Sequence, residues 1–196
     1  MPLQPGGLLL APGAGASRAQ SALVAIDKAA TAAGWEVVRM DFPYRKAGRR
    51  APDKPPVLLR AVEEEAAALA ERAGSLVLGG RSMGGRMCSM AVAAQTVAAA
   101  GLVLISYPLH PPGYPERART EHFADLRVPC LFVSGTRDAF GTPDELDAAT
   151  AAIPGPVTHR WVIGKDHALR GVDSEVAEFV VDWLSQRAPA GDPDQP

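Results

Sequence analysis

The chain has 196 residues, of which 47% are hydrophobic and 21% are charged, and its formal net charge is −2. This length suits a single globular domain with a buried core, and the near-neutral charge gives no reason to expect a nucleic-acid or membrane partner. The two cysteines lack zinc-ligand spacing and the N-terminus resembles neither a signal peptide nor a membrane span, so we expect a cytoplasmic protein.

Short apolar runs alternate with amphipathic stretches, which is the pattern of βαβ units built on a parallel sheet. We expect one domain over residues 1–187 and a disordered tail over 188–196. The six predicted strands cover residues 7–11, 35–41, 76–79, 101–107, 130–135 and 157–163.

Five helices are predicted between and after these strands. The first begins with Ser17 and Gln20 spaced as a capping box and stops at Gly34. The fourth opens at a second capping box, Thr142 with Glu145, and has proline at its first position. The others cover residues 58–73, 82–98 and 172–184, and a loop rich in Pro, Gly, Arg and Lys is predicted over 42–56.

The pentapeptide Gly80-Arg81-Ser82-Met83-Gly84 lies between a predicted strand and a predicted helix. A Gly-x-Ser-x-Gly at such a junction is the nucleophile elbow of α/β-hydrolases. A turn this sharp strains its central residue and holds the hydroxyl clear of the sheet, while glycines on either side avoid clashes. Because glycine is common in this chain, the pentapeptide alone is weak evidence for a nucleophile. A candidate acid and a candidate base must also be found later in the sequence.

A serine hydroxyl needs a base to take its proton, and that base needs an orienting acid. In this fold the chain order is serine, acid, histidine. Asp138 follows the fifth predicted strand and His167 follows the sixth, so both lie at the sheet edge where Ser82 opens. We therefore predict a catalytic set of Ser82, Asp138 and His167.

The sequence alone leaves open which acid orients His167 and whether Asp138 has a different role. Asp138 could cap a turn, and Asp166 could serve as the acid, although neighbours in sequence such as Asp166 and His167 usually point apart. Asp144 and Glu145 already have capping positions.

The remaining histidines fit the role of base less well. His159 falls inside a predicted strand, and His122 lies before the fifth strand. His110 precedes the acid, which is the wrong order for a base, but it follows the fourth strand near the predicted site. We therefore interpret His110 as a candidate substrate-contacting residue.

An oxyanion hole needs two preorganised N–H donors. The Met83 amide, directly after the nucleophile, is one candidate. The glycine-rich loop after the first strand supplies the other, and Ala14 is our choice. The flanking Gly13 and Gly15 let the backbone approach a substrate and are candidate binding residues.

A dinucleotide-binding turn is the competing interpretation of this loop, because Gly13-x-Gly15 follows a strand and precedes a helix. The third glycine position is occupied by Arg18, and Asp41 stands too far along for the expected acid. These departures count against a nucleotide site.

A cluster of basic residues occupies the loop after the second strand. In a solvated loop such charges keep the surface soluble; the sharper hypothesis is that they attract an anionic substrate. The cluster, here called the basic loop (residues 45–54), contains Arg45, Lys46, Arg49, Arg50 and Lys54.

Several stretches taken together resemble one family. They are residues 8–16, 42–44 with 48–50, 80–86, 106–112, 135–138 and 166–167. The chain resembles small bacterial α/β-hydrolases related to dienelactone hydrolase, and also the hydrolase-like domain of a eukaryotic histone-acetyltransferase complex subunit and its testis-expressed relative. The resemblance implies an α/β-hydrolase fold and the triad predicted above.

The implied fold is a minimal six-stranded parallel sheet in the order 2-1-3-4-5-6, with helices on both faces and no lid domain. Ligands in such sheets bind where the strand order reverses, which places the glycine-rich loop opposite Ser82. One departure concerns the oxyanion hole: Pro12, which has no N–H, stands where family members commonly carry histidine.

The sequence thus predicts a serine hydrolase that acts on a small-molecule acyl substrate, an ester or thioester, without a metal or organic cofactor. Two alternatives belong to other classes. One is a non-catalytic interaction module with the same fold, and the other is a flavin or nucleotide binder with the same strand order.

Overall fold

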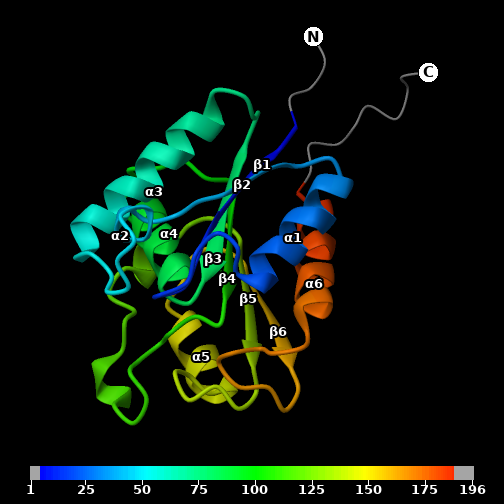
Figure 1. Cartoon of the computed structure of the whole chain (residues 1–196). Coiled ribbons are helices and arrows are strands. Elements are labelled where there is room, and N and C mark those ends of the chain that lie inside the picture. The colour runs from blue at the N-terminus through cyan, green and yellow to red at the C-terminus, as the bar shows by residue number, and fades with distance from the viewer. Residues whose placement is uncertain (1–4, 188–196) are drawn as a thin grey trace.

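The computed structural model describes residues 5–187 and contains a six-stranded, all-parallel sheet (Figure 1). The strands are ordered β2-β1-β3-β4-β5-β6, as predicted. Their bounds are β1 Gly7–Ala11, β2 Glu36–Arg39, β3 Leu76–Arg81, β4 Gly101–Ile105, β5 Cys130–Gly135 and β6 Val157–Val162. The order reverses between β1 and β3, so the loops that follow these two strands face one another at one edge of the sheet.

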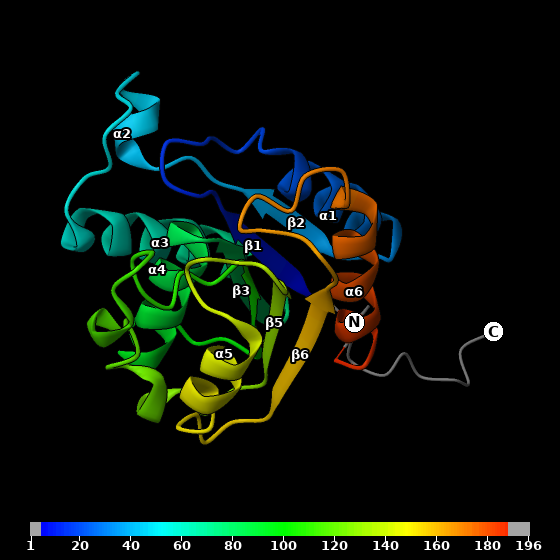
Figure 2. The ribbon, with the colours of Figure 1, turned by 90° about the horizontal axis from the view of Figure 1, so that it is seen from below.

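Helices cover both faces of the sheet, as Figures 1 and 2 show. One layer contains α1 (Ser21–Ala32) and α6 (Asp173–Ser185). The other contains α3 (Pro55–Ala70), α4 (Met83–Ala93) and α5 (Pro143–Thr150). Three short helices complete the structure: α2 (Pro43–Lys46), η1 (Pro115–Arg117) and η2 (Phe123–Asp125).

Alternate residues of the strands supply two separate cores. Leu9 packs with α3 and α4, whereas Leu8 and Leu10 pack with α1 and α6. Every residue of β1, β4 and β5 is buried, because a parallel sheet carries helices on both faces. The buried centre of the sheet, formed by β1, β3, β4 and β5, therefore ends directly beneath the loops that carry the candidate site.

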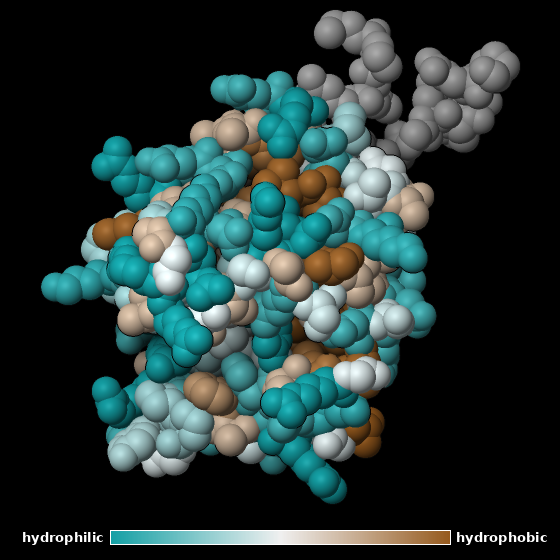
Figure 3. Space-filling view, viewed as in Figure 1, coloured by the Kyte–Doolittle hydropathy of each residue, from teal (hydrophilic) through white to brown (hydrophobic). Residues whose placement is uncertain are grey.

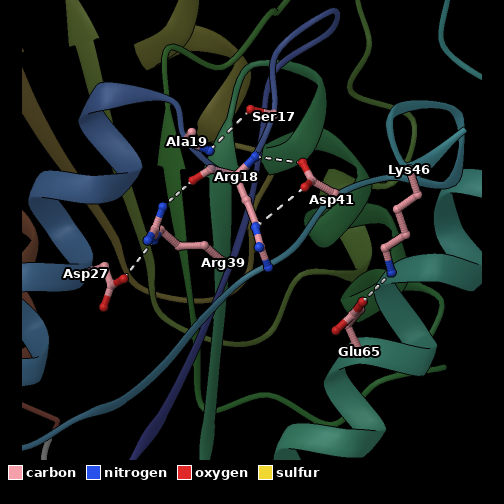
Figure 4. Close-up of polar contacts among 8 residues, drawn as sticks. All are labelled: Ser17, Arg18, Ala19, Asp27, Arg39, Asp41, Lys46 and Glu65. Atoms are coloured by element: carbon pink, nitrogen blue, oxygen red, sulfur yellow. Dashed lines mark hydrogen bonds and ion pairs between the residues drawn. The ribbon is translucent and has the colours of Figure 1, made fainter. Parts of the chain in front are cut away.

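One predicted capping box is wrong. Helix α1 begins at Ser21, and Gln20 caps it without a side-chain hydrogen bond. Instead, Ser17 Oγ accepts from the Ala19 amide, and Asp41 accepts from the Arg18 amide at 2.7 Å, which holds a turn before the helix (Figure 4). The Gln20 side chain reaches the glycine-rich loop, where its role is described below.

The second capping box is confirmed. Thr142 accepts from the Glu145 amide, and the Glu145 carboxylate accepts in return from the Thr142 amide. This reciprocal pairing satisfies two donors that the start of a helix leaves free. Pro143 occupies the first helical position, as expected.

Several predicted boundaries move, for local reasons. Strand β4 ends at Ile105 rather than at 107, because Ser106 has a positive φ of 46°. Helix α4 ends at Ala93 rather than near 98, and Gln95 then adopts a φ of 58°. Strand β2 is shorter than predicted, and the short helix α2 lies where only a loop was expected.

The surface gives no sign of a membrane-spanning segment in the described residues. None of the helices between residues 5 and 187 has the length and apolar composition needed to cross a bilayer. In Figure 3 the face shown is mostly hydrophilic, with hydrophobic residues in separate small patches. The tail predicted over 188–196 lies outside the described residues.

Candidate active site

Ser82 lies between the end of β3 and the start of α4 with a φ of 50° and a ψ of −116°. For a residue with a side chain this conformation costs on the order of 1–3 kcal/mol and persists only where the surroundings fix it. The Ser82 amide donates to the Ile105 carbonyl at 2.8 Å, which anchors the turn to β4. The hydroxyl therefore stands free of the backbone network, as a nucleophile elbow requires.

The two glycines of the motif allow this turn to pack. A Cβ on Gly80 would lie 2.3 Å from the Ala11 carbonyl oxygen, and a Cβ on Gly84 would lie equally close to the same atom. Real Cβ atoms do not approach backbone that closely. Glycine at both positions thus lets α4 start directly against β1.

His167 joins Ser82 to Asp138. The distance from Ser82 Oγ to His167 Nε2 is 2.9 Å, and from His167 Nδ1 to Asp138 Oδ2 it is 2.8 Å. Because an ionised carboxylate can only accept, Nδ1 carries the imidazole proton and Nε2 is left to accept from the serine hydroxyl. Asp138 is buried, and its second oxygen accepts from the Phe140 amide at 2.8 Å.

Two further contacts fix the imidazole. The Phe140 ring lies against it, with ring centroids 4.1 Å apart. The Arg81 guanidinium donates to the backbone carbonyl of His167. Burial lowers the pKa of Arg81, while the negative charge of nearby acids, Asp138 first among them, acts in the opposite direction.

The alternatives for acid and base have other partners. Asp166 accepts from the Ala168 amide at 2.9 Å and so closes its own turn. His122 contacts Ser89 Oγ at 2.8 Å, and His159 contacts Thr150 at 3.0 Å. None of these contacts involves Ser82.

The glycine-rich loop leaves one amide free for a substrate. The Gly13 amide donates to the Gln20 side chain at 3.1 Å, and the Gly15 amide donates to the Tyr44 hydroxyl at 3.1 Å. Among residues 5–187 the amides of Ala14 and Met83 have no hydrogen-bond partner. Both residues line the cavity beside Ser82, where the sequence predicted an oxyanion hole.

A cavity of about 440 Å³ lies over this arrangement, within the usual range for small-molecule sites. Its lining residues come from the end of β3, the first turn of α4 and the segments that follow β1, β4, β5 and β6. They are Gly13, Ala14, Gln20, Arg81, Ser82, Met83, Arg86, Pro108, Arg119, Phe140 and His167.

Sequence reasoning did not assign six of these lining residues to the site: Gln20, Arg81, Arg86, Pro108, Arg119 and Phe140. Position 86 follows Ser82 by one helical turn, so the sequence held a signal that its side chain faces the same way. Arg119 lies in the segment between β4 and β5, which had no pattern to connect it with the site.

Other predicted binding residues lie elsewhere or have no free donor. His110 is buried, contacts the Pro111 carbonyl at 2.9 Å, and lines a different hollow together with Glu145. It is not among the residues that line the Ser82 cavity. Gly15 is not among them either, and Gly13 lines the cavity with its amide already bonded to Gln20.

The described residues were also compared with what a metal centre or a reactive thiol would need. Within the described range 5–187, no three His, Cys, Asp or Glu side chains lie close enough together to hold a metal ion. Cys88 and Cys130 are both buried, and burial raises the pKa of each thiol to about 12. They behave as small core residues, as the sequence suggested.

One family model and several solved structures are similar to this chain. Residues 5–180 match the model of a family described as alpha/beta hydrolase domain. The fold is similar to that of an α/β serine hydrolase without a lid from Xanthomonas campestris, at 21% identity over 96% of this chain and 85% of that chain, with a TM-score of 0.76. A serine hydrolase homologue from Coxiella burnetii has a TM-score of 0.75 at 20% identity, covering 92% and 85% of the two chains.

A dienelactone hydrolase from Anabaena variabilis is also similar, at 16% identity over 93% of this chain and 87% of that chain, with a TM-score of 0.73. At these identities the structural likeness extends to the fold alone. The resemblance to a histone-acetyltransferase complex subunit stays a prediction.

Proposed function

Because this chain belongs to the alpha/beta hydrolase domain family, we propose that it is a serine hydrolase that cleaves a small carboxylic ester, thioester or related acyl compound. One observation carries the proposal. An unbroken hydrogen-bonded series runs from Ser82 through His167 to the buried Asp138, and the serine at its start is held in a strained turn.

In the first half of the reaction, Ser82 Oγ attacks the acyl carbonyl carbon while His167 Nε2 takes the hydroxyl proton. The carbonyl oxygen becomes an oxyanion that accepts from the free amides of Ala14 and Met83. The C–O or C–S bond of the substrate then breaks, and the leaving group takes the proton from His167.

In the second half, a water molecule gives a proton to His167 and attacks the acyl-enzyme. The ester bond to Ser82 breaks, the carboxylic acid leaves, and Ser82 regains its proton. Asp138 keeps the imidazole in the tautomer that accepts from serine and stabilises the imidazolium that forms.

The structure also suggests how the site is arranged before a substrate arrives. The segment between β4 and β5 carries only η1 and η2, and residues 5–187 contain no lid domain. We therefore expect hydrolysis of dissolved monomeric substrates without activation by a lipid interface.

A fluorophosphonate probe tests the proposal, because it reacts covalently with an activated serine. We expect labelling of the wild type and none of Ser82→Ala. Ser89→Ala is the matched control: Ser89 also contacts a histidine, but its side chain is buried, so its removal should leave labelling intact.

Each other outcome has a clear meaning. Equal labelling of wild type and Ser82→Ala would assign the reaction to a different serine. Absence of labelling in the folded wild type would contradict the proposal and favour a non-catalytic binding module.

A further inference from the structure

Two arginines that the proposed reaction does not use line the cavity beside Ser82. Arg86 lies on α4, one turn after Ser82, and its amide donates to the Ser82 carbonyl at 3.1 Å. Residues four apart on a helix share a face, so Arg86 lines the same cavity as Ser82. Arg119 enters from the segment between η1 and η2.

No carboxylate of the described residues forms an ion pair with either arginine, although the charge of Glu121 opposes the lowering of the Arg119 pKa. Among residues 5–187, neither guanidinium has an Asp or Glu oxygen within 4.0 Å. No acidic side chain lines the cavity. Arg86 Nε is shielded from solvent and has no hydrogen-bond partner, and Arg119 Nη1 donates to the Pro108 carbonyl at 3.3 Å.

Two titratable side chains near Arg86, His122 and Tyr107, stay uncharged at neutral pH. Burial and the positive charge of Arg86 lower the pKa of His122 to about 4, although Glu121 and Asp125 act weakly in the opposite direction. Burial raises the pKa of the Tyr107 phenol. The pKa of Arg119 is lowered, first by burial and then by Arg86. Two like charges therefore face one cavity, and an anion placed between them would stabilise both.

The third arginine of the cavity has a different role. Arg81 donates to the His167 carbonyl, and acidic groups surround it. This bond fixes the backbone that carries the imidazole, and Asp138, Asp173 and Asp166 partly offset the charge of Arg81, although none of them forms an ion pair with it. We therefore consider Arg86 and Arg119 as the anion-binding pair.

We propose that Arg86 and Arg119 bind a carboxylate of the substrate, so that the preferred substrates are small acyl compounds with a second, negatively charged end. A guanidinium presents two parallel N–H donors that match the two oxygens of a carboxylate. This inference rests on the proposed function for the reaction, but the anion subsite is a separate feature of the cavity.

Hydrolysis of two esters of equal chain length tests the inference. We would compare kcat/KM for monomethyl adipate, which carries a carboxylate, with that for methyl hexanoate, which is neutral. The wild type should prefer the charged ester at least about 10-fold, and Arg86→Gln should reduce that preference about 10- to 100-fold, as expected for loss of hydrogen bonds to a charged group.

Arg117→Gln is the matched control, because Arg117 lies in the same segment as Arg119 but is exposed and contacts Tyr114. It should leave the preference unchanged. A wild type without preference, or an Arg86→Gln variant that keeps the full preference, would overturn the inference. Arg119→Gln provides a second test if Arg86→Gln does not fold.

A binding measurement separates the subsite from the reaction. Adipate dianion should bind Ser82→Ala protein, and adding Arg86→Gln or Arg119→Gln should weaken that binding at least about 10-fold in calorimetry. Equal binding with and without the arginines would overturn the inference, as would tighter binding of inorganic phosphate than of adipate.

The two proposals can fail separately. Fluorophosphonate labelling without any charge preference would leave the serine chemistry standing and remove the carboxylate subsite. Arginine-dependent adipate binding in a protein that is never labelled would do the reverse.

Discussion

The basic loop and the Ser82 cavity both carry several arginines, but the surroundings of these charges differ. In the basic loop, Lys46 pairs with Glu65 at 3.0 Å, as Figure 4 shows, and Arg49 pairs with Asp53 at 2.7 Å. In the cavity, Arg86 and Arg119 have no acidic partner among residues 5–187. The sequence left two interpretations of the basic loop open, a solvated surface or attraction of an anionic substrate, and the ion pairs of the loop favour the cavity arginines as the anion-binding groups.

The difference shows why counting charges is a weak guide to binding. An exposed ion pair contributes little free energy and leaves little field for a ligand. A buried guanidinium without a partner, by contrast, has lost its water and gains most from an incoming anion. Arg86 and Arg119, which line the cavity with Ser82, are half-buried and lack a carboxylate partner, and Arg86 Nε is shielded from solvent without any hydrogen bond.

The largest expected effect compares two carboxylates, one from each region. Asp138→Asn should lower kcat for a neutral short ester about 10³- to 10⁴-fold, because asparagine can reverse the imidazole tautomer and stop Nε2 from accepting the serine proton. Asp53→Asn, which removes a paired carboxylate from the basic loop, should change kcat less than about 2-fold. Steady-state hydrolysis of p-nitrophenyl butyrate measures both.

If kcat fell by similar factors in Asp138→Asn and Asp53→Asn, the loss in Asp138→Asn would not come from catalysis, and a role of Asp138 in folding alone would explain it. Unfolding curves of the two variants, recorded beside the kinetics, distinguish that case.

The next effect concerns two glycines. Gly84→Ala should lower the free energy of unfolding by about 3 kcal/mol or more, because its Cβ would lie 2.3 Å from the Ala11 carbonyl oxygen and the backbone must shift. Gly48→Ala should cost about 1–2 kcal/mol, because its φ is +72° but no atom lies within 4 Å of the new Cβ. Urea denaturation measures both values. Equal costs would show that the elbow relaxes freely.

The smallest effect is expected for the basic loop itself. Replacing Lys46 and Arg49 together by glutamine should change kcat/KM for monomethyl adipate less than about 2-fold and should cost less than about 1 kcal/mol per ion pair. Both quantities come from the assays already described. A fall in kcat/KM for monomethyl adipate as large as that expected for Arg86→Gln would indicate that the basic loop, too, binds the anionic substrate.

Much of the fold follows from the sequence because its signals are local. Buried apolar runs such as residues 101–105 and 130–135 can only be central strands of a covered sheet. Parallel strands end at one edge, so Ser82, Asp138 and His167 were predicted to meet from their positions after three strands. The contacts between these side chains agree with that reasoning.

The remaining features depend on contacts between distant segments. Gln20 looked like a capping residue because its spacing from Ser17 fits, but the side chain bonds to Gly13 across the loop. His110 follows a strand near the site, yet its ring turns toward Glu145. Neither the Gln20–Gly13 contact nor the His110–Glu145 contact produces a periodic or local pattern in the sequence from which it could be predicted.

The Gly15 amide donates a hydrogen bond to the Tyr44 hydroxyl, and this contact lets the segment that precedes the basic loop hold the glycine-rich loop in place. Tyr44 belongs to α2, is fully buried and stacks with Phe42, so its hydroxyl is a fixed acceptor. It holds the glycine-rich loop in one shape while the neighbouring Ala14 amide remains free. The entropy of ordering this flexible loop is thus lost once, during folding, and not in every catalytic cycle.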